Sequence, residues 1–121
     1  MTNDDLANLK RLRRLKSLTL QSTKISEGRV LGLGDMNLER LSVERTRFSD
    51  EGLASLSPAK DLKHLNLTRT KVSDEGLVYL ESLPNLEYVV LRRTLVTKEG
   101  FEGLKQRLPD CRIRWEPLVQ R

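Results

Sequence analysis

The chain has 121 residues, of which 32% are charged, 37% hydrophobic and only 4% aromatic, and its formal net charge is +5. This length fits a single domain over 1–121, and the sequence contains no run of about 18 apolar residues that could span a membrane. The one cysteine, Cys111, excludes an internal disulfide and a cysteine-rich metal site. Together with the acidic start MTNDD, it favours a cytoplasmic protein without a secretory signal.

Taken in chain order, the first predicted element is a short helical segment within 1–14. Leu6, Leu9 and Leu12 recur at a spacing of three, which is typical of a short helix or 3₁₀ segment with one apolar side. We expect this half-unit to cover the N-terminal end of the domain and to keep its charged residues in water.

Residues 15–107 repeat themselves every 23 or 24 positions. The four copies begin at Leu15, Leu38, Leu62 and Leu86, and in each copy three aliphatic residues are followed by a threonine at fixed spacing. A constant period of this length is typical of a solenoid, in which each copy buries its apolar side only against its neighbours.

Each copy contains two predicted elements, which are clearest in the third copy. Residues 65–67 (Leu-Asn-Leu) alternate apolar and polar side chains, which predicts a short strand with one buried face. Leu77, Leu80 and Leu83 follow at a spacing of three, which predicts a short helix or 3₁₀ segment. Because the middle residue is polar in three of the four strands, one face of the resulting parallel sheet should be open to water.

The last predicted element is a capping strand within 108–121. Cys111, Ile113 and Trp115 alternate with arginines, so the apolar side of this strand can face the core. We expect Trp115 to be the buried plug of this end, with its indole N–H near the edge where a hydrogen-bond partner is available. Cys111 is expected to be a small buried hydrophobic residue.

The pattern LxxLxLxxTxVSDEGLxxLxxLPN, best seen in residues 62–85, resembles the leucine-rich-repeat family and is closest to its short bacterial type. The resemblance implies an α/β fold, a right-handed leucine-rich-repeat solenoid. Its curved parallel sheet would form the concave face, and short helices or 3₁₀ segments would form the convex face. It also implies a non-enzymatic module that binds a protein partner.

Threonines occupy the position where the family usually has Asn or Cys: Thr23, Thr46, Thr70 and Thr94. Each copy of the repeat forms one turn of the solenoid, which we call a coil. A hydroxyl can donate and accept at once, so we expect these side chains to bridge backbone groups of adjacent coils. The glycine-rich segment at 32–35 departs from the pattern and should be irregular.

The acidic motif Ser-Asp-Glu-Gly, at 49–52 and 73–76, raises the question of a metal site. Serine at a helix N-cap followed by carboxylates in the first turn satisfies free N–H groups and complements the helix dipole, so we favour a capping role. The lone histidine, His64, is predicted to lie on the open strand face, where the sequence places no acid and nucleophile beside it. We therefore expect no metal, no cofactor and no enzymatic activity.

Basic residues recur just after the predicted strands and form what we call the basic margin: Arg45, Arg47, Arg69, Lys71 and Arg93. Stacked coils would align them along one side of the open face. Two interpretations stay open, a docking surface for an acidic partner and a solvated flank that keeps the protein soluble. No aromatic residues are interleaved with these positions, which argues against nucleic acid.

The residues expected to bind a partner point outward from the strands: Arg40, Glu44, His64, Asn66, Tyr88, Val90 and Arg92. Tyrosine and arginine are enriched in interface hot spots, and an exposed Val90 between Tyr88 and Arg92 would be unusual in a polar column. The alternative interpretation is that the tail at 116–121 covers part of Tyr88 and Val90.

The main functional hypothesis is a non-enzymatic protein–protein interaction module that uses the concave sheet face. One alternative is a polyanion or nucleic-acid binder that acts through the basic margin. The other is an adaptor fragment of a larger protein. We expect no contact with a membrane, and a monomer or weak homo-oligomer.

Overall fold

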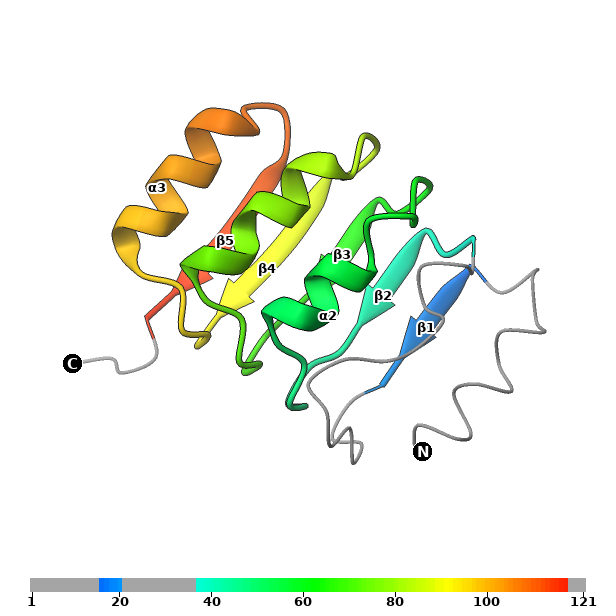
Figure 1. Ribbon diagram of the computed structural model, residues 1–121, viewed down its shortest axis with the longest axis horizontal. Helices are drawn as coiled ribbons and strands as arrows, with labels where there is room; N and C mark the ends of the chain where they lie inside the picture. Colours follow the sequence, from blue (N-terminus) through cyan, green and yellow to red (C-terminus); the bar gives the residue numbers. More distant parts are fainter. Residues whose placement is uncertain (1–15, 21–36, 118–121) are drawn as a thin grey trace.

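The computed structural model describes residues 16–20 and 37–117 (Figure 1). In chain order its elements are β1 (Ser17–Thr19), β2 (Arg40–Ser42), α2 (Asp50–Ser55), β3 (His64–Asn66), the 3₁₀ helix η2 (Asp74–Ser82), β4 (Tyr88–Arg92), α3 (Lys98–Arg107) and β5 (Arg112–Glu116). Three of the predicted features lie outside the described residues: the N-terminal cap at 1–14, Thr23 and the glycine-rich segment at 32–35.

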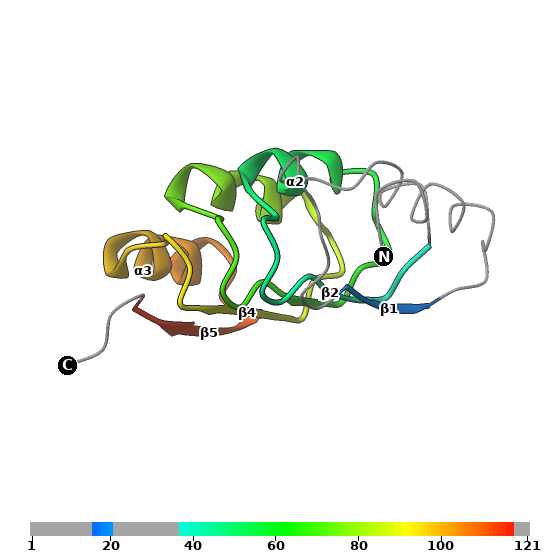
Figure 2. The same ribbon diagram turned by 90° about the horizontal axis from the view of Figure 1, so that it is seen from below.

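The strands form one sheet in the order β1-β2-β3-β4-β5, and every neighbouring pair is parallel. Figure 2 shows the strands in one layer and α2, η2 and α3 in a second layer on one side of it. The opposite face of the sheet carries no helix within the described part of the chain. The prediction of an α/β solenoid with one open sheet face is therefore confirmed, and the curvature of the sheet stays a prediction.

The core is built from the same position of successive strands. Leu41 pairs with Leu65, Leu65 with Val89, and Val89 with Ile113. The first three are buried and Ile113 is partly buried against them. Full burial of one such side chain contributes roughly 1.5–3 kcal/mol, so each coil depends for its stability on the coil above and below it.

The helical half of each coil follows the spacing of its leucines. Leu77 and Leu80 lie in η2 and Leu83 ends it, and all three are buried because a 3₁₀ helix has three residues per turn. In α3 the apolar residues include Phe101 and Leu104, and the segment forms a ten-residue α-helix. The prediction of short helices or 3₁₀ segments is confirmed.

The recurring threonines have a structural role, but each of them acts within its own coil. Thr46 Oγ1 donates to the Val43 carbonyl at 2.7 Å and accepts from the Phe48 N–H at 3.2 Å. Thr70 and Thr94 each donate to the carbonyl three residues earlier. The expectation that these hydroxyls bridge adjacent coils is wrong, because the short side chain reaches only the tight turn that contains it. Adjacent coils are joined there by backbone hydrogen bonds instead.

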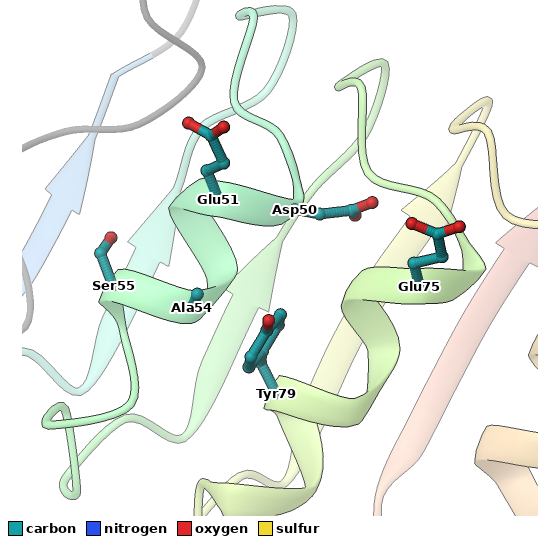
Figure 3. A pocket seen from close by; sticks show the side chains of 6 residues that line it. All are labelled: Asp50, Glu51, Ala54, Ser55, Glu75 and Tyr79. Carbon is teal, nitrogen blue, oxygen red and sulfur yellow. The ribbon is translucent and has the colours of Figure 1, made fainter.

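Asp50 at the start of α2 links two adjacent coils. Its Oδ1 accepts a hydrogen bond from the Ser73 N–H at 2.8 Å, and its Oδ2 accepts from the Ser73 hydroxyl. Figure 3 shows the Asp50 side chain extending from α2 toward η2. A Cβ atom added at Gly76 would overlap the Asp50 carboxylate, so this glycine leaves room for the link. We call the arrangement an aspartate strut.

Asp74 forms a second strut one coil later. It accepts from the Thr97 N–H at 2.9 Å and from the Thr97 hydroxyl at 2.6 Å, and a Cβ at Gly100 would overlap it. Lys98 takes the aspartate position of the following coil, and no further helix follows α3 among the described residues.

The struts revise the capping role predicted for the acidic motif. Thr97 caps its own helix, since its Oγ1 accepts from the Gly100 N–H at 3.1 Å. Ser73 occupies the N-cap position of η2 but forms no side-chain cap hydrogen bond. Its hydroxyl donates to the aspartate of the preceding coil, as the Thr97 hydroxyl also does one coil later.

The C-terminal end is closed by β5, which pairs with β4 over five residues. The Trp115 ring stacks on Phe101 with 5.4 Å between ring centroids, and its indole N–H donates to the Val96 carbonyl at 3.0 Å. The predicted hydrogen bond is confirmed, but Trp115 is only partly buried, because it lies on the last described strand of the sheet. Cys111 is also partly buried, and this burial raises the pKa of its thiol.

Candidate partner-binding face

The open face of the sheet is an ordered array because the strands pair without slippage. The first column runs through the residues Arg40, His64, Tyr88 and Arg112. The second column runs through Ser42, Asn66, Val90 and Arg114. Parallel strands lie about 4.8 Å apart, so side chains in one column are close neighbours.

Five of the predicted partner-binding residues surround one shallow hollow of about 220 Å³ on this face: Arg40, His64, Asn66, Tyr88 and Val90. Ser42 and the edges of Leu41 and Leu65 complete its lining. The other two predicted residues, Glu44 and Arg92, do not line this hollow; they lie farther toward the carboxyl ends of β2 and β4.

His64 and Tyr88 form an aromatic pair at the centre of the first column. Their ring centroids are 6.0 Å apart with an interplanar angle of 65°, an edge-to-face arrangement. Both rings also line a second hollow of about 640 Å³, with Glu87, Asp110 and Arg112. The pair is therefore a ridge between two hollows, one beside Arg40 and one beside Arg112.

Val90 is not the exposed apolar residue that the sequence suggested. Only 8% of its surface is accessible, because Asn66 and Arg114 flank it on the neighbouring strands. It forms part of the wall of the smaller hollow, while Tyr88 next to it stays partly exposed. In the alternative interpretation the tail covers part of both side chains, and residues 118–121 of that tail lie outside the described residues.

Asn66 has a defined orientation. Its Oδ1 accepts from the Thr68 N–H at 3.0 Å and from the Thr68 hydroxyl at 2.6 Å. Since the oxygen is occupied by these two donors, the side-chain NH₂ is the group left to donate outward.

Arg112 and Arg114 belong to the same face and were missed as candidate site residues. β5 continues the register of β4, so Arg112 lies beside Tyr88 and Arg114 beside Val90. Both arginines are exposed. The alternation of arginine with Ile113 and Trp115 was the signal in the sequence that could have identified them.

The basic margin lies at the turns that leave the strands. Arg45, Arg69 and Arg93 all have left-handed backbone, with φ values of 60°, 57° and 55°. A hollow of about 440 Å³ is lined by Arg69, Thr70, Lys71, Arg93 and Leu95. Arg69, Lys71 and Arg93 therefore lie around one hollow, and the alignment of the whole margin along the open face stays a prediction.

The family model described as Leucine Rich repeat matches residues 34–57 and 60–80. These two consecutive stretches contain β2, α2, β3 and most of η2, which are the two coils joined by the first aspartate strut. The chain contains leucine-rich repeats. No curated protein matches its sequence.

Leucine-rich-repeat proteins are generally non-enzymatic modules for protein–protein interaction. In this one, no helix among residues 16–20 and 37–117 is long and apolar enough to cross a membrane. Over the same residues, no three His, Cys, Asp or Glu side chains are grouped so that they could hold a metal ion.

The helical side of the leucine-rich repeats carries a groove of about 470 Å³ between α2 and η2. It is lined by Asp50, Glu51, Ala54, Ser55, Glu75 and Tyr79 (Figure 3). Asp50 is occupied by the strut to Ser73, whereas Glu51 and Glu75 are exposed to solvent. Because the Asp50 carboxylate in its wall binds Ser73 of the next coil, the groove is part of the contact between two coils.

Proposed function

We propose that this leucine-rich-repeat protein binds a protein partner on the open face of its sheet, with Tyr88 at the centre of the contact. The observation that supports this site is the ridge of His64 and Tyr88 between two hollows, each with an arginine at its far side. A projecting aromatic ring beside shaped hollows is the arrangement in which interface hot spots are found.

The chemistry of the face defines the partner. Four arginines occupy outward positions around the ridge, and two carboxylates line the larger hollow beside it: Arg40, Arg92, Arg112 and Arg114, with Glu87 and Asp110. The polar neighbours Asn66 and Ser42 add hydrogen-bonding groups within the smaller hollow. A partner loop with one apolar or aromatic residue against Tyr88 and carboxylates on either side of it would satisfy these groups.

The proposal treats 1–121 as one domain, with 1–14 and 108–121 as the segments that cover its two ends. The domain would act as a monomer or weak homo-oligomer, and it would need no cofactor because binding is its activity. A cytoplasmic location belongs to the same proposal.

The experiment compares two tyrosines on opposite sides of the molecule. Tyr88 lies on the sheet face, and Tyr79 lies in η2 on the helical side with 38% of its surface exposed. Partners are captured with the intact chain from cell extract, identified, purified and titrated against the parent, Tyr88→Ala and Tyr79→Ala. We expect Tyr88→Ala to weaken binding by about 30-fold or more, which is the effect of losing one hot spot, and Tyr79→Ala to leave it within about twofold.

Loss of binding in Tyr79→Ala with full binding in Tyr88→Ala would move the site to the helical side and refute the proposal. The polyanion alternative is separated by salt. A partner held through phosphate contacts loses affinity by orders of magnitude between about 50 and 200 mM salt, whereas a hot-spot interface does not.

A further inference from the structure

The basic margin consists of two parallel columns that run across the coils. Column one is Arg45, Arg69 and Arg93, and column two is Arg47, Lys71 and Leu95. Leu95 stands where the two preceding coils have a basic residue, and half of its surface is exposed.

Backbone hydrogen bonds hold each column in register. In column one, the N–H of Arg45 donates to the Thr68 carbonyl and the N–H of Arg69 to the Arg92 carbonyl, both at 2.9 Å. In column two, the N–H of Lys71 donates to the Phe48 carbonyl at 2.8 Å. The turns therefore keep the spacing of the strands, which is about 4.8 Å per coil.

The local backbone does not explain why arginine occupies column one. A φ near +60° favours glycine or asparagine, and a larger residue is strained there. Arginine nevertheless stands at this position in three successive coils. Among the described residues, none of the basic side chains in the two columns forms an ion pair. Five uncompensated cations, three of them at turns whose backbone favours other residues, form a surface suited to an acidic ligand.

The spacing selects the kind of ligand. Three positions of a column span about 9.6 Å, because strands are about 4.8 Å apart. Three residues that lie one turn apart on an α-helix span about 10.8 Å, so a helix with acidic residues on one side matches the column to within about 1.2 Å. Alternate residues of an extended peptide are about 6.7 Å apart, so three of them overshoot the column by nearly 4 Å.

We propose that the two columns bind an acidic amphipathic helix of a protein partner, lying across the coils, with an apolar residue of that helix against Leu95. Carboxylates at positions i, i+3, i+4 and i+7 of the helix would face both columns. Leu95, the last residue of column two, would then form an apolar contact with the helix where the basic residues of that column end. This surface is separate from the sheet face around Tyr88, so an experiment can refute the proposal for one surface without refuting the proposal for the other.

The test uses synthetic helices as probes. One alanine-rich 15-residue peptide carries glutamates at i, i+3, i+4, i+7 and i+8, with a leucine one turn beyond. A second has the same composition with the glutamates dispersed around the helix. A 15-nucleotide single-stranded oligothymidine is the third probe. Binding of each labelled probe to the full chain is measured by fluorescence anisotropy at about 50 mM salt, where surface electrostatics are least screened.

Two triple variants with the same loss of charge are compared. The test variant is Arg45→Gln, Arg69→Gln and Arg93→Gln. The control variant is Lys60→Gln, Lys63→Gln and Lys105→Gln, whose lysines lie before β3 or in α3 and therefore away from the columns. Unchanged urea midpoints establish that both remain folded.

We expect the one-sided peptide to bind at least about tenfold more tightly than the dispersed peptide. We also expect the test variant to lose about tenfold in affinity, which corresponds to three modest ion pairs, while the control variant changes less than about twofold. Leu95→Ser should weaken the one-sided peptide by about threefold and leave the dispersed peptide unchanged, because it removes one apolar contact.

Equal binding of the two peptides, or equal losses in the two triple variants, would overturn the proposal, since net charge would then explain the affinity. Tighter binding of the oligonucleotide than of the one-sided peptide would assign the columns to nucleic acid instead. Self-association in sedimentation experiments that disappears in the test variant would assign them to a second copy of this chain.

Discussion

Removal of an aspartate strut should destabilise the protein far more than removal of a neighbouring acid on the same helix. In Asp50→Ala, the N–H and hydroxyl of Ser73 lose the carboxylate that accepts from both of them. Glu51 is the matched control, because it lies in the same first turn of α2 but is exposed, and its side chain forms no hydrogen bond or ion pair with the next coil among the described residues.

The magnitude follows from the two hydrogen bonds. A hydrogen bond to a charged group contributes about 1.5–3 kcal/mol when buried, and this site is only partly buried. Solvent screening at this partly buried site about halves the contribution of each bond. The loss of both bonds should therefore lower the free energy of unfolding of Asp50→Ala by roughly 1.5–3 kcal/mol. Glu51→Ala loses only its interaction with the helix dipole, about 0.3–1 kcal/mol.

Urea unfolding followed by circular dichroism measures both variants, with the slope m compared to the parent to check that unfolding stays two-state. Lys98→Ala is a further control, since Lys98 occupies the aspartate position at the start of α3, and no further helix follows α3 among the described residues. We expect this variant to lower the free energy of unfolding by less than about 0.5 kcal/mol. If Asp50→Ala and Glu51→Ala shift the free energy of unfolding equally, the strut has no role in stability and the reasoning fails.

Three further predictions follow from the turns and the C-terminal end. Thr46→Val should lower the free energy of unfolding by roughly 1–3 kcal/mol, because its buried hydroxyl both donates and accepts; an unchanged urea midpoint would contradict this. Arg69→Gly should raise the free energy of unfolding by about 0.5–1 kcal/mol, because glycine adopts φ near 57° without strain but loses more entropy; a lower midpoint would show that the arginine side chain stabilises the turn. The Cys111 thiol should react with iodoacetamide more slowly in the folded protein than in urea at pH 8. Its raised pKa leaves less thiolate at that pH, so the difference should narrow as the pH rises; equal rates in both states would exclude this shift.

Much of the fold could be predicted from particular residues. The alternation in Leu65-Asn66-Leu67 gave β3, and the spacing of Leu77 and Leu80 gave a 3₁₀ segment, because burial on one side imposes these periods directly on the sequence. The candidate site was predicted in part. His64 and Tyr88 were recognised as outward residues at equivalent positions of successive copies, but their edge-to-face contact depends on the orientation of the two rings, which the sequence does not specify by itself.

The sequence alone determined the repeat, its period, the inward and outward positions of each strand and the family to which the chain belongs. These features are local or recur at fixed intervals, so one copy can be compared with the next. The tertiary structure alone decided that Asp50 bonds to Ser73 of the next coil, that Val90 is buried between Asn66 and Arg114, and that arginines occupy left-handed turns. Each of these depends on which atoms of neighbouring coils come within contact distance, and that is set by the stacking of the coils and not by the order of residues within any one of them.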